Sequence, residues 1–206
     1  MRNKEKSTSI VFLRHGQTDF PTNRIYCDDV EDPALNVNGL AQAKSTALSF
    51  IDSNIKKIYC SPAKRTLMTA KEVVSITGAE LEVVPEWVER RFGEWEGLYF
   101  NDIEERFSAA YSEWKQDMVG YTPKGGETIN DVVARLKGGL QRIVSRHMEE
   151  DILIVTHVGP IRISLCRAMG IPLANYRQIR VDYASKSRID YGETRNNLIY
   201  LNQYDY

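Results

Sequence analysis

Two of the three histidines in the chain, His15 and His157, follow the same kind of segment. Each comes at the end of a short apolar run without polar alternation, and a glycine follows within two residues. Such runs are typical of strands buried on both faces of a sheet. Because ligands of open α/β sheets bind at the carboxyl ends of the strands, we expect both imidazoles at one site.

Two arginines are expected at the same edge. Arg14 directly precedes His15, and Arg65 lies shortly after a third apolar run that ends at Cys60. Guanidinium groups and the backbone N–H groups at helix starts both match phosphate oxygens. The cluster therefore predicts an anion site with a phosphoryl group as its natural occupant, although each residue taken singly could serve structure alone.

The third histidine, His147, is expected to be structural. It lies in line with the apolar positions of the helical stretch before it. At such a position a hydrogen-bonded core or edge histidine is more common than a catalytic one.

Strand and helix patterns alternate along the chain. Strands are predicted at residues 10–13, 58–60 and 152–156, with closing strands at 179–181 and 197–201. Helical spacing of apolar residues is found at 40–51, 67–74, 129–144 and 161–168. Thr128 and Asp131 resemble a capping box at the start of the third helix. We expect an α/β fold, a three-layer sandwich whose mostly parallel sheet carries helices on both faces.

The segment from about residue 85 to 127 differs from the rest. It is rich in Trp, Tyr, Phe, Glu and Gly, and helical spacing of its apolar residues is confined to 103–114. No repeat, low-complexity tract or linker divides the 206 residues. We therefore expect one domain over 1–206 in which this segment is an inserted, lid-like element.

Composition bears on partners and compartment. The 27 Lys and Arg residues and the 28 Asp and Glu residues leave a net charge of −1, so no charge excess indicates nucleic acid or an anionic membrane. The cysteines Cys27, Cys60 and Cys166 lack CxxC spacing, which fits a reducing compartment. No apolar run approaches the roughly 18 residues of a membrane span. We expect a cytoplasmic protein, and its oligomeric state is left open.

Four segments, in order, resemble the signatures of the histidine phosphatase (phosphoglycerate mutase-like) superfamily. They are Leu13–Thr18, Ser61–Ala70, Glu89–Gly97 and Thr156–Arg162. The stretch Pro33–Ala43 is similar to a fifth element of that family. Any one of these patterns is weak, but together they cover nearly the whole chain.

The resemblance implies a phosphomonoester hydrolase that acts through a phosphohistidine on a small phosphorylated metabolite, without cofactor or metal. It implies His15 as the nucleophile and Glu89 as the proton donor to the leaving oxygen. It assigns the phosphoryl oxygens to Arg14, Arg65 and His157, with Gly16 and Thr18 as further phosphate-binding residues. The chemistry agrees, because neighbouring arginines disfavour a protonated ring and so keep the imidazole nucleophilic.

Three other carboxylates compete with Glu89 for the role of acid. They are Glu86, Glu94 and Glu96. Glu89 is chosen because it alone precedes Phe92-Gly93 by the family's spacing.

The chain departs from the family pattern in two places. Phe20-Pro21 stands where many relatives have Trp-Asn, and Val158 stands where a glycine commonly follows the second histidine. No side-chain role is therefore assigned to Pro21 or Val158. Instead, Arg24 and Tyr26 are assigned to substrate binding on the leaving-group side, with Asn23 as an alternative.

Within the superfamily, the chain looks most similar to the α-ribazole phosphatase and broad-specificity phosphatase branch. The similarity lies in residues 111–114, 123–127, 169–172 and 180–182. The long basic, proline-rich insertion with which mutases grip a carboxylate-bearing sugar phosphate is missing. We therefore expect hydrolysis, with α-ribazole phosphate as a candidate substrate. Aromatic residues that could stack on a flat leaving group are Trp95, Tyr99, Trp114 and Tyr121.

Three alternatives remain open at this point. The first is mutase-type phosphoryl transfer. The second is a metal-dependent hydrolase with His15, His157 and Glu89 as ligands, against which two nearby arginines count because they would repel the cation. The third is a non-catalytic module that binds a phosphorylated ligand.

Overall fold

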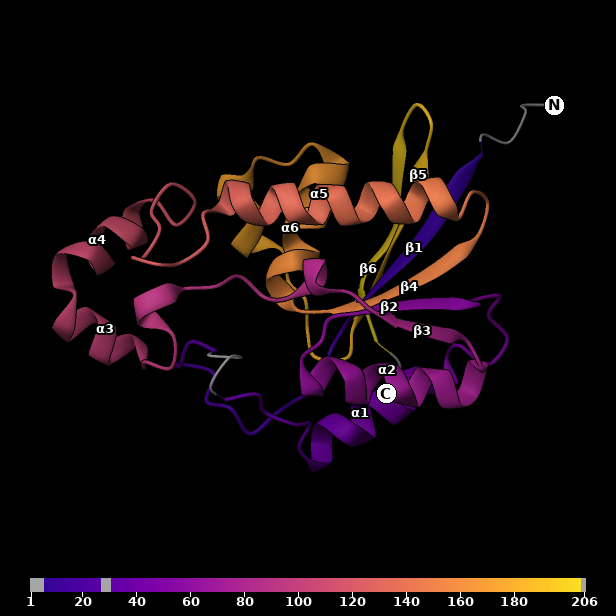
Figure 1. The fold of residues 1–206 in the computed structure, drawn as a ribbon, viewed down its shortest axis with the longest axis horizontal. Helices are drawn as coiled ribbons and strands as arrows, with labels where there is room; N and C mark the ends of the chain where they lie inside the picture. Colours follow the sequence, from indigo (N-terminus) through magenta and orange to yellow (C-terminus); the bar gives the residue numbers. More distant parts are fainter. Residues whose placement is uncertain (1–5, 27–30, 205–206) are drawn as a thin grey trace.

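A computed structural model describes residues 6–26 and 31–204 (Figure 1). Its strands are β1 (Ser7–Arg14), β2 (Lys57–Cys60), β3 (Glu80–Val83), β4 (Asp151–Thr156), β5 (Lys186–Gly192) and β6 (Asn196–Gln203). Its α-helices are α1 (Val37–Leu48), α2 (Lys64–Thr77), α3 (Phe100–Arg106), α4 (Ser108–Gln116), α5 (Ile129–Arg146) and α6 (Val158–Met169). Short 3₁₀ helices are η1 (Pro85–Trp87), η2 (Gly93–Trp95) and η3 (Leu173–Gln178).

The strands form one mixed sheet between two helical layers. Its order is β3-β2-β4-β1-β5-β6, with parallel pairing from β3 to β1 and antiparallel pairing of β5 with both neighbours. Helices α5 and α6 cover one face and α1 and α2 the other (Figure 1). The predicted three-layer α/β fold is confirmed.

The apolar run of β1 reflects its place between the two layers. Ile10 and Phe12 belong to the hydrophobic cluster under α5 and α6, whereas Val11 and Leu13 belong to the cluster under α1 and α2. Side chains alternate between the faces of a strand, so a strand covered on both sides needs apolar residues at every position.

The closing strands are predicted only in part. Strand β6 contains the expected residues 197–201, but the strand expected at 179–181 is wrong. Its place in the sheet is taken by β5, which begins at Lys186. Strand β5 is rich in charged and hydroxyl residues, so its apolar signal is weak, and in the folded protein the buried Lys186 and Ser187 lie within it.

Helix α5 begins with the capping box expected from its sequence. The Thr128 hydroxyl accepts a hydrogen bond from the backbone N–H of Asp131, and the Asp131 carboxylate accepts one from the backbone N–H of Thr128. These contacts satisfy donors that a helix start leaves without partners.

Residues 85–127 form a wall at one side of the sheet, and its helices α3 and α4 lie to the left of the sheet in Figure 1. The helical stretch expected at 103–114 is two helices, α3 and α4, because the backbone leaves the helical region at Phe107. The wall has a small core of its own around Trp95, Ile103 and Trp114. Trp95 is fully buried there, so its ring serves packing and has no exposed face for a ligand.

Two buried or half-buried arginines hold the segment that carries Glu89, one from within the wall and one from α5. Arg90 donates hydrogen bonds to the backbone carbonyls of Met118, Tyr121 and Glu127. Arg135 of α5 donates to the backbone carbonyl of Glu89 and pairs with the Glu127 carboxylate. The segment that carries Glu89 is thus held from both sides.

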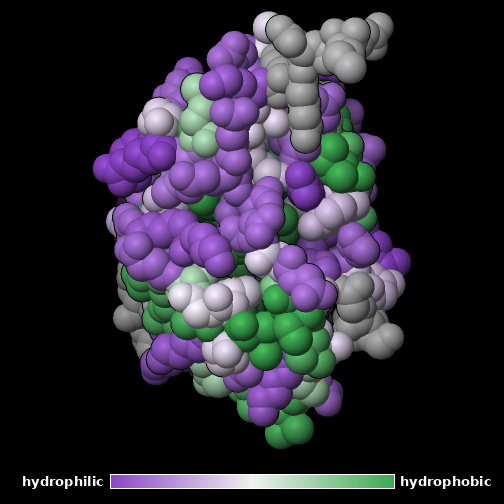
Figure 2. Space-filling model, turned by 90° about the vertical axis from the view of Figure 1, so that its right-hand side faces the viewer, coloured by the Kyte–Doolittle hydropathy of each residue, from purple (hydrophilic) through white to green (hydrophobic). Residues whose placement is uncertain are grey.

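The opposite end of the molecule, where β1 begins, is mainly hydrophilic (Figure 2). Apolar residues appear there as separate patches. In residues 6–26 and 31–204, no helix is long and apolar enough to span a bilayer.

Candidate active site

The carboxyl ends of three neighbouring strands bring the predicted site residues together. His15 follows β1, His157 follows β4, and Ser61 follows β2. The N–H of His15 donates to the carbonyl of Thr156 at 3.1 Å, and the N–H of Ser61 donates to that of Val155 at 3.0 Å. The parallel register therefore places these residues side by side, as expected from the apolar runs.

The imidazole of His15 is held as a neutral ring with a defined tautomer. Its Nδ1 lies 2.8 Å from the carbonyl oxygen of Gly16. A carbonyl oxygen only accepts, so Nδ1 carries the proton and Nε2 keeps a free lone pair. Burial, aided by the charges of Arg65 and Arg14, lowers the pKa of His15 well below its ordinary value.

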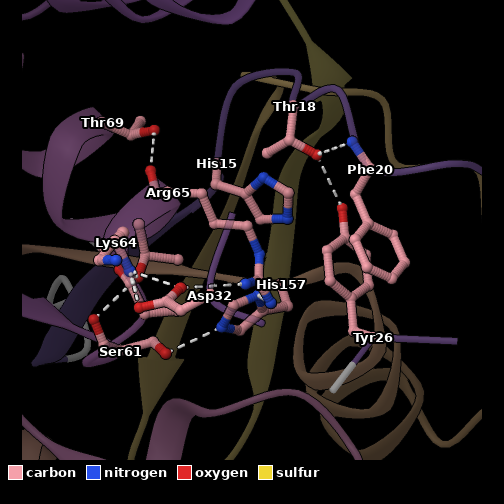
Figure 3. A network of polar contacts seen from close by, with 12 residues as sticks. His15, Thr18, Phe20, Tyr26, Asp32, Ser61, Lys64, Arg65, Thr69 and His157 are labelled. Carbon is pink, nitrogen blue, oxygen red and sulfur yellow. Dashed lines mark hydrogen bonds and ion pairs between the residues drawn. The ribbon is translucent and has the colours of Figure 1, made fainter. Parts of the chain in front are cut away.

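His157 is fixed between Arg65 and Ser61 (Figure 3). Nη2 of Arg65 lies 3.0 Å from Nδ1, and Oγ of Ser61 lies 2.8 Å from Nε2. Because a guanidinium only donates, Nδ1 is the acceptor, and Nε2 carries the proton that it donates to Ser61. Burial, with the Arg65 charge next in effect, lowers the pKa of His157 well below its ordinary value. The rings of His15 and His157 lie 5.3 Å apart between centroids.

Ser61 is the first residue of the family-like segment Ser61–Ala70, but the sequence alone indicated no role for its side chain. We expect Ser61→Ala to lower kcat/KM for p-nitrophenyl phosphate by about 5- to 100-fold, because the buried Nε2–H of His157 loses its acceptor. Ser53→Ala is a matched control, since that hydroxyl donates to the carbonyl of Phe50 outside the site. Unchanged kinetics in both variants would contradict a positioning role for Ser61.

The two arginines enter the site from different layers. Arg65, in the first turn of α2, is fully buried, and its guanidinium lies 4.2 Å from the ring centroid of Tyr26. Arg14 stacks on Tyr183 at 3.8 Å and donates to the carbonyl of Val181 at 2.7 Å. Its Nε is buried, and no group in the described part of the chain accepts a hydrogen bond from it. An unsatisfied buried guanidinium N–H is an available donor for an anion.

Asp32 lies beside Arg65 and was not predicted. Its carboxylate accepts two hydrogen bonds from the backbone N–H of Lys64, at 3.0 Å each, and lies 3.7 Å from Nη1 of Arg65. It supplies the cap that Ala63, at the N-cap position of α2, lacks. Asp32 thus both orients the guanidinium of Arg65 and caps the helix to which Arg65 belongs.

Gly16 and Thr18 have protein partners in this structure. The Gly16 N–H donates to the hydroxyl of Thr69 at 3.1 Å, and a Cβ at Gly16 would lie 2.4 Å from the carbonyl oxygen of Gly39. The Thr18 hydroxyl contacts the hydroxyl of Tyr26 at 3.1 Å (Figure 3). Their roles in phosphate binding stay predictions.

Glu89 is bound through both of its carboxylate oxygens. Oε1 accepts from the N–H of Arg90 at 2.8 Å, and Oε2 accepts from the N–H of Gly159 at 3.1 Å. Gly159 lies in the first turn of α6, two residues after His157 at the N-cap position. The backbone of α6 thereby holds the carboxylate near the second histidine.

Two of the competing carboxylates are engaged elsewhere. Glu86 forms an ion pair with Arg142 at 2.6 Å, and Glu96 accepts from the N–H of Phe92 at 2.8 Å. Neither forms a hydrogen bond to α6, whereas Glu89 does.

Gly159 is required for this placement of Glu89. A Cβ at position 159 would lie 2.1 Å from Oε1 of Glu89, and that oxygen is the movable end of a side chain. We expect Gly159→Ala to fold with little change in melting temperature but to lower kcat on an alkyl phosphate by about 10-fold or more, because the displaced carboxyl no longer reaches the leaving oxygen. Gly138→Ala, on α5 with open space at its Cβ, is the matched control. Full activity of Gly159→Ala would contradict the role of this glycine.

A cavity of about 380 Å³ adjoins Arg14 and Glu89. Arg24, Tyr26 and Trp114 also line it, which places both predicted leaving-group residues at one opening. Arg24 is tied to the wall, since its Nε donates to the carbonyl of Gly97 at 2.7 Å and its Nη1 pairs with Glu31 at 2.7 Å.

His147 has the structural role expected for it. Its ring nitrogens contact the hydroxyl of Tyr59 at 2.9 Å and the carboxylate of Glu150 at 2.8 Å. Among the described residues, no three His, Cys, Asp or Glu side chains lie together as the ligands of a metal ion would. Cys60 and Cys166 are free thiols, and Cys27 lies outside the described residues.

Comparisons with known proteins agree with this geometry. Phosphoserine phosphatase 1 of Hydrogenobacter thermophilus is 29% identical over 94% of this chain and 91% of its own length. The bifunctional protein Rv2228c of Mycobacterium tuberculosis is 31% identical over 97% of this chain, which spans 55% of that protein. The crystal structure of the alpha-ribazole phosphatase of Shigella flexneri superposes with a TM-score of 0.85 at 27% identity, over 95% of this chain and 96% of that one. Residues 10–204 match the family model of the histidine phosphatase superfamily (branch 1), and the chain belongs to that superfamily.

Proposed function

We propose that this protein hydrolyses a small phosphomonoester through a phosphohistidine at His15. The observation that carries the proposal is the hydrogen bond from Nδ1 of His15 to the carbonyl of Gly16, at 2.8 Å, which leaves Nε2 as an unprotonated nucleophile. Arg14 and Arg65 lie on either side with charges that suit a transferring phosphoryl group.

In the first step, Nε2 of His15 attacks phosphorus and a P–N bond forms. The bond from phosphorus to the ester oxygen breaks, and Glu89 donates a proton to the departing alkoxide. Arg14 and Arg65 bind the phosphoryl oxygens, for which Arg65 turns from Nδ1 of His157 to the anion. His157 then carries its proton on Nδ1 and donates it to a phosphoryl oxygen, while Nε2 accepts from the hydroxyl of Ser61.

In the second step, water attacks the phosphohistidine. Glu89, now ionised, takes a proton from that water, the P–N bond breaks, and inorganic phosphate leaves. His15 returns to its neutral form with the lone pair on Nε2. No metal ion takes part in either step.

The substrate class is a small phosphorylated metabolite. The relatives named as phosphoserine phosphatase and alpha-ribazole phosphatase support this class, so phosphoserine and α-ribazole phosphate are candidate substrates. We infer a single domain over 1–206 in which residues 85–127 act as the lid-like wall of the leaving-group cavity. The free thiols of Cys60 and Cys166 support a cytoplasmic location.

The test is to trap the intermediate. Rapid quenching during turnover of a phosphorus-labelled monoester is expected to give an acid-labile, base-stable adduct that maps to the peptide containing His15. Vanadate is expected to inhibit, and EDTA is expected to have no effect.

Three results would contradict the proposal. Inhibition by EDTA would favour metal-dependent hydrolysis, and interconversion of 3- and 2-phosphoglycerate faster than hydrolysis would favour a mutase. Binding of phosphomonoesters without turnover or adduct would favour a non-catalytic module.

A further inference from the structure

Two cavities meet at Glu89, and their charges differ. The cavity of about 380 Å³ contains Arg14, Arg162 and Arg177 on its walls, with Glu89 as its carboxylate. A neighbouring cavity of about 500 Å³ has more carboxylates than cations on its walls, namely Asp32, Glu89, Glu96 and Glu127 against Arg90 and Arg91. A negatively charged ester is attracted to the first cavity and repelled by the second.

Most cations around the first cavity are engaged by the protein. Arg24 pairs with Glu31, and the guanidinium of Arg90 is filled by three backbone carbonyls. Arg14 stands next to His15 and belongs to the phosphoryl group. Two guanidinium groups, those of Arg162 and Arg177, are therefore left over.

The side chain of Arg162 is held in one orientation by a hydrogen bond. It extends from α6 one turn after Gly159, and its Nε donates to the carbonyl of Ile179 at 2.7 Å. Burial, with the charges of Arg177 and then Arg14 as the next largest effects, lowers the pKa of Arg162, and the carboxylate of Glu89 acts in the opposite direction. Arg177 lies on η3 with its guanidinium 5.4 Å from the ring centroid of Trp114.

Arg162 and Arg177 differ from Arg24 in their partners. Within residues 6–26 and 31–204, no ion pair joins Arg162 or Arg177 to an acidic side chain. Like charges gathered at a partly buried wall are costly unless an anion offsets them. The phosphoryl group does not fill this need, because it is bound by Arg14 and Arg65.

We propose that Arg162 and Arg177 bind a carboxylate on the alcohol part of the substrate, so that the preferred esters are short phosphorylated hydroxy acids. This inference rests on the proposed function, since it assigns the cavity beside Glu89 to the leaving group. A carboxylate matches the planar fork of a guanidinium, and its carbon chain packs against the apolar wall at Trp114, Phe100 and Ile163. Loss of that carboxylate leaves the half-buried Arg162 and the exposed Arg177 at the rim without an anion to bind.

A matched series of three-carbon esters tests the proposal. 3-Phosphoglycerate, glycerol 3-phosphate and glycerol 1,3-bisphosphate differ at the far end, which is a carboxylate, a hydroxymethyl group and a phosphate. We expect kcat/KM for 3-phosphoglycerate hydrolysis to exceed that for glycerol 3-phosphate by about 10- to 100-fold, as for charge-assisted hydrogen bonds that only one ester can make.

Arg177→Met is the principal variant, because Arg177 is exposed and its loss leaves the fold intact. It is expected to reduce the preference for 3-phosphoglycerate about 10-fold, mainly through KM. Arg162→Met is expected to reduce it further. Arg167→Met, also on α6 but lining a different cavity, is the matched control and is expected to keep the wild-type preference.

The outcomes separate the inference from the proposed function. Turnover of all three esters with equal kcat/KM, or an unchanged preference in Arg177→Met, would overturn the carboxylate site while leaving phosphohistidine chemistry in place. A higher kcat/KM for the bisphosphate would overturn the carboxylate in favour of a second phosphate. Absence of turnover and of a phosphoenzyme with every ester would overturn both.

Discussion

Replacing His15 by alanine is expected to lower phosphomonoester hydrolysis by on the order of 10⁴- to 10⁶-fold, the scale of loss when a covalent nucleophile is removed. Nε2 of His15 is the lone pair left free at the strand ends, because Nδ1 of the neighbouring His157 accepts from Arg65. When an ester draws Arg65 away from His157, Nδ1 of that ring turns to a phosphoryl oxygen, so His157 still offers no free nucleophile. The measurement is kcat on p-nitrophenyl phosphate together with the trapped adduct.

His147→Ala is the matched control for this experiment. It removes an imidazole whose contacts are to Tyr59 and Glu150, so activity per folded molecule is expected to stay at the wild-type level. Circular dichroism and melting temperature show whether each variant is folded. A labelled adduct that persists in His15→Ala would refute the assignment of the nucleophile.

Glu89→Gln is expected to cost about 10²- to 10⁴-fold on an alkyl phosphate, the usual range for general acid catalysis. A p-nitrophenolate leaves without a proton, so the loss on p-nitrophenyl phosphate is expected to be distinctly smaller in the phosphorylation step. The amide offers one oxygen where the carboxylate offers two to Arg90 and Gly159, so part of the loss is in placement. Because the proposed mechanism also has Glu89 take a proton from water in the second step, the comparison must use the burst of the first turnover.

The control for the acid is Glu86→Gln. Glu86 pairs with Arg142, so its replacement is expected to change the burst little on either substrate. Equal losses on both substrates in Glu89→Gln would mean that Glu89 shapes the pocket without donating the proton. A large leaving-group-dependent loss in Glu86→Gln or Glu94→Gln would move the role to that residue.

The central strands and the meeting of the two histidines could be predicted from the sequence. Buried parallel strands have continuous apolar runs in their sequence, and the central residues of β1 and β4 form such runs. The carboxyl ends of two neighbouring parallel strands lie at the same edge of the sheet. Local sequence patterns were therefore enough to predict that His15 and His157 lie close together. The positions of Arg14 and Arg65 at this edge could be predicted for the same reason.

The leaving-group side could not be predicted in this way. Arg162 and Arg177 come together because η3 packs on α6, and no spacing in the sequence records that docking. Glu89 likewise depends on Gly159, which lies 70 residues further along the chain. Strand β5 was misplaced because its polar residues become buried only after pairing with β1.

The way in which Arg90 joins the first residues of the wall to its last ones has a consequence for how the pocket can change. Its guanidinium contacts main-chain carbonyls of Met118, Tyr121 and Glu127, and every residue type has such a carbonyl. Substitutions of those side chains therefore leave the anchor in place. A wall fixed through its backbone can accept new side chains facing the leaving group while the phosphoryl site stays constant, which makes this segment the natural place to evolve or engineer a different substrate preference.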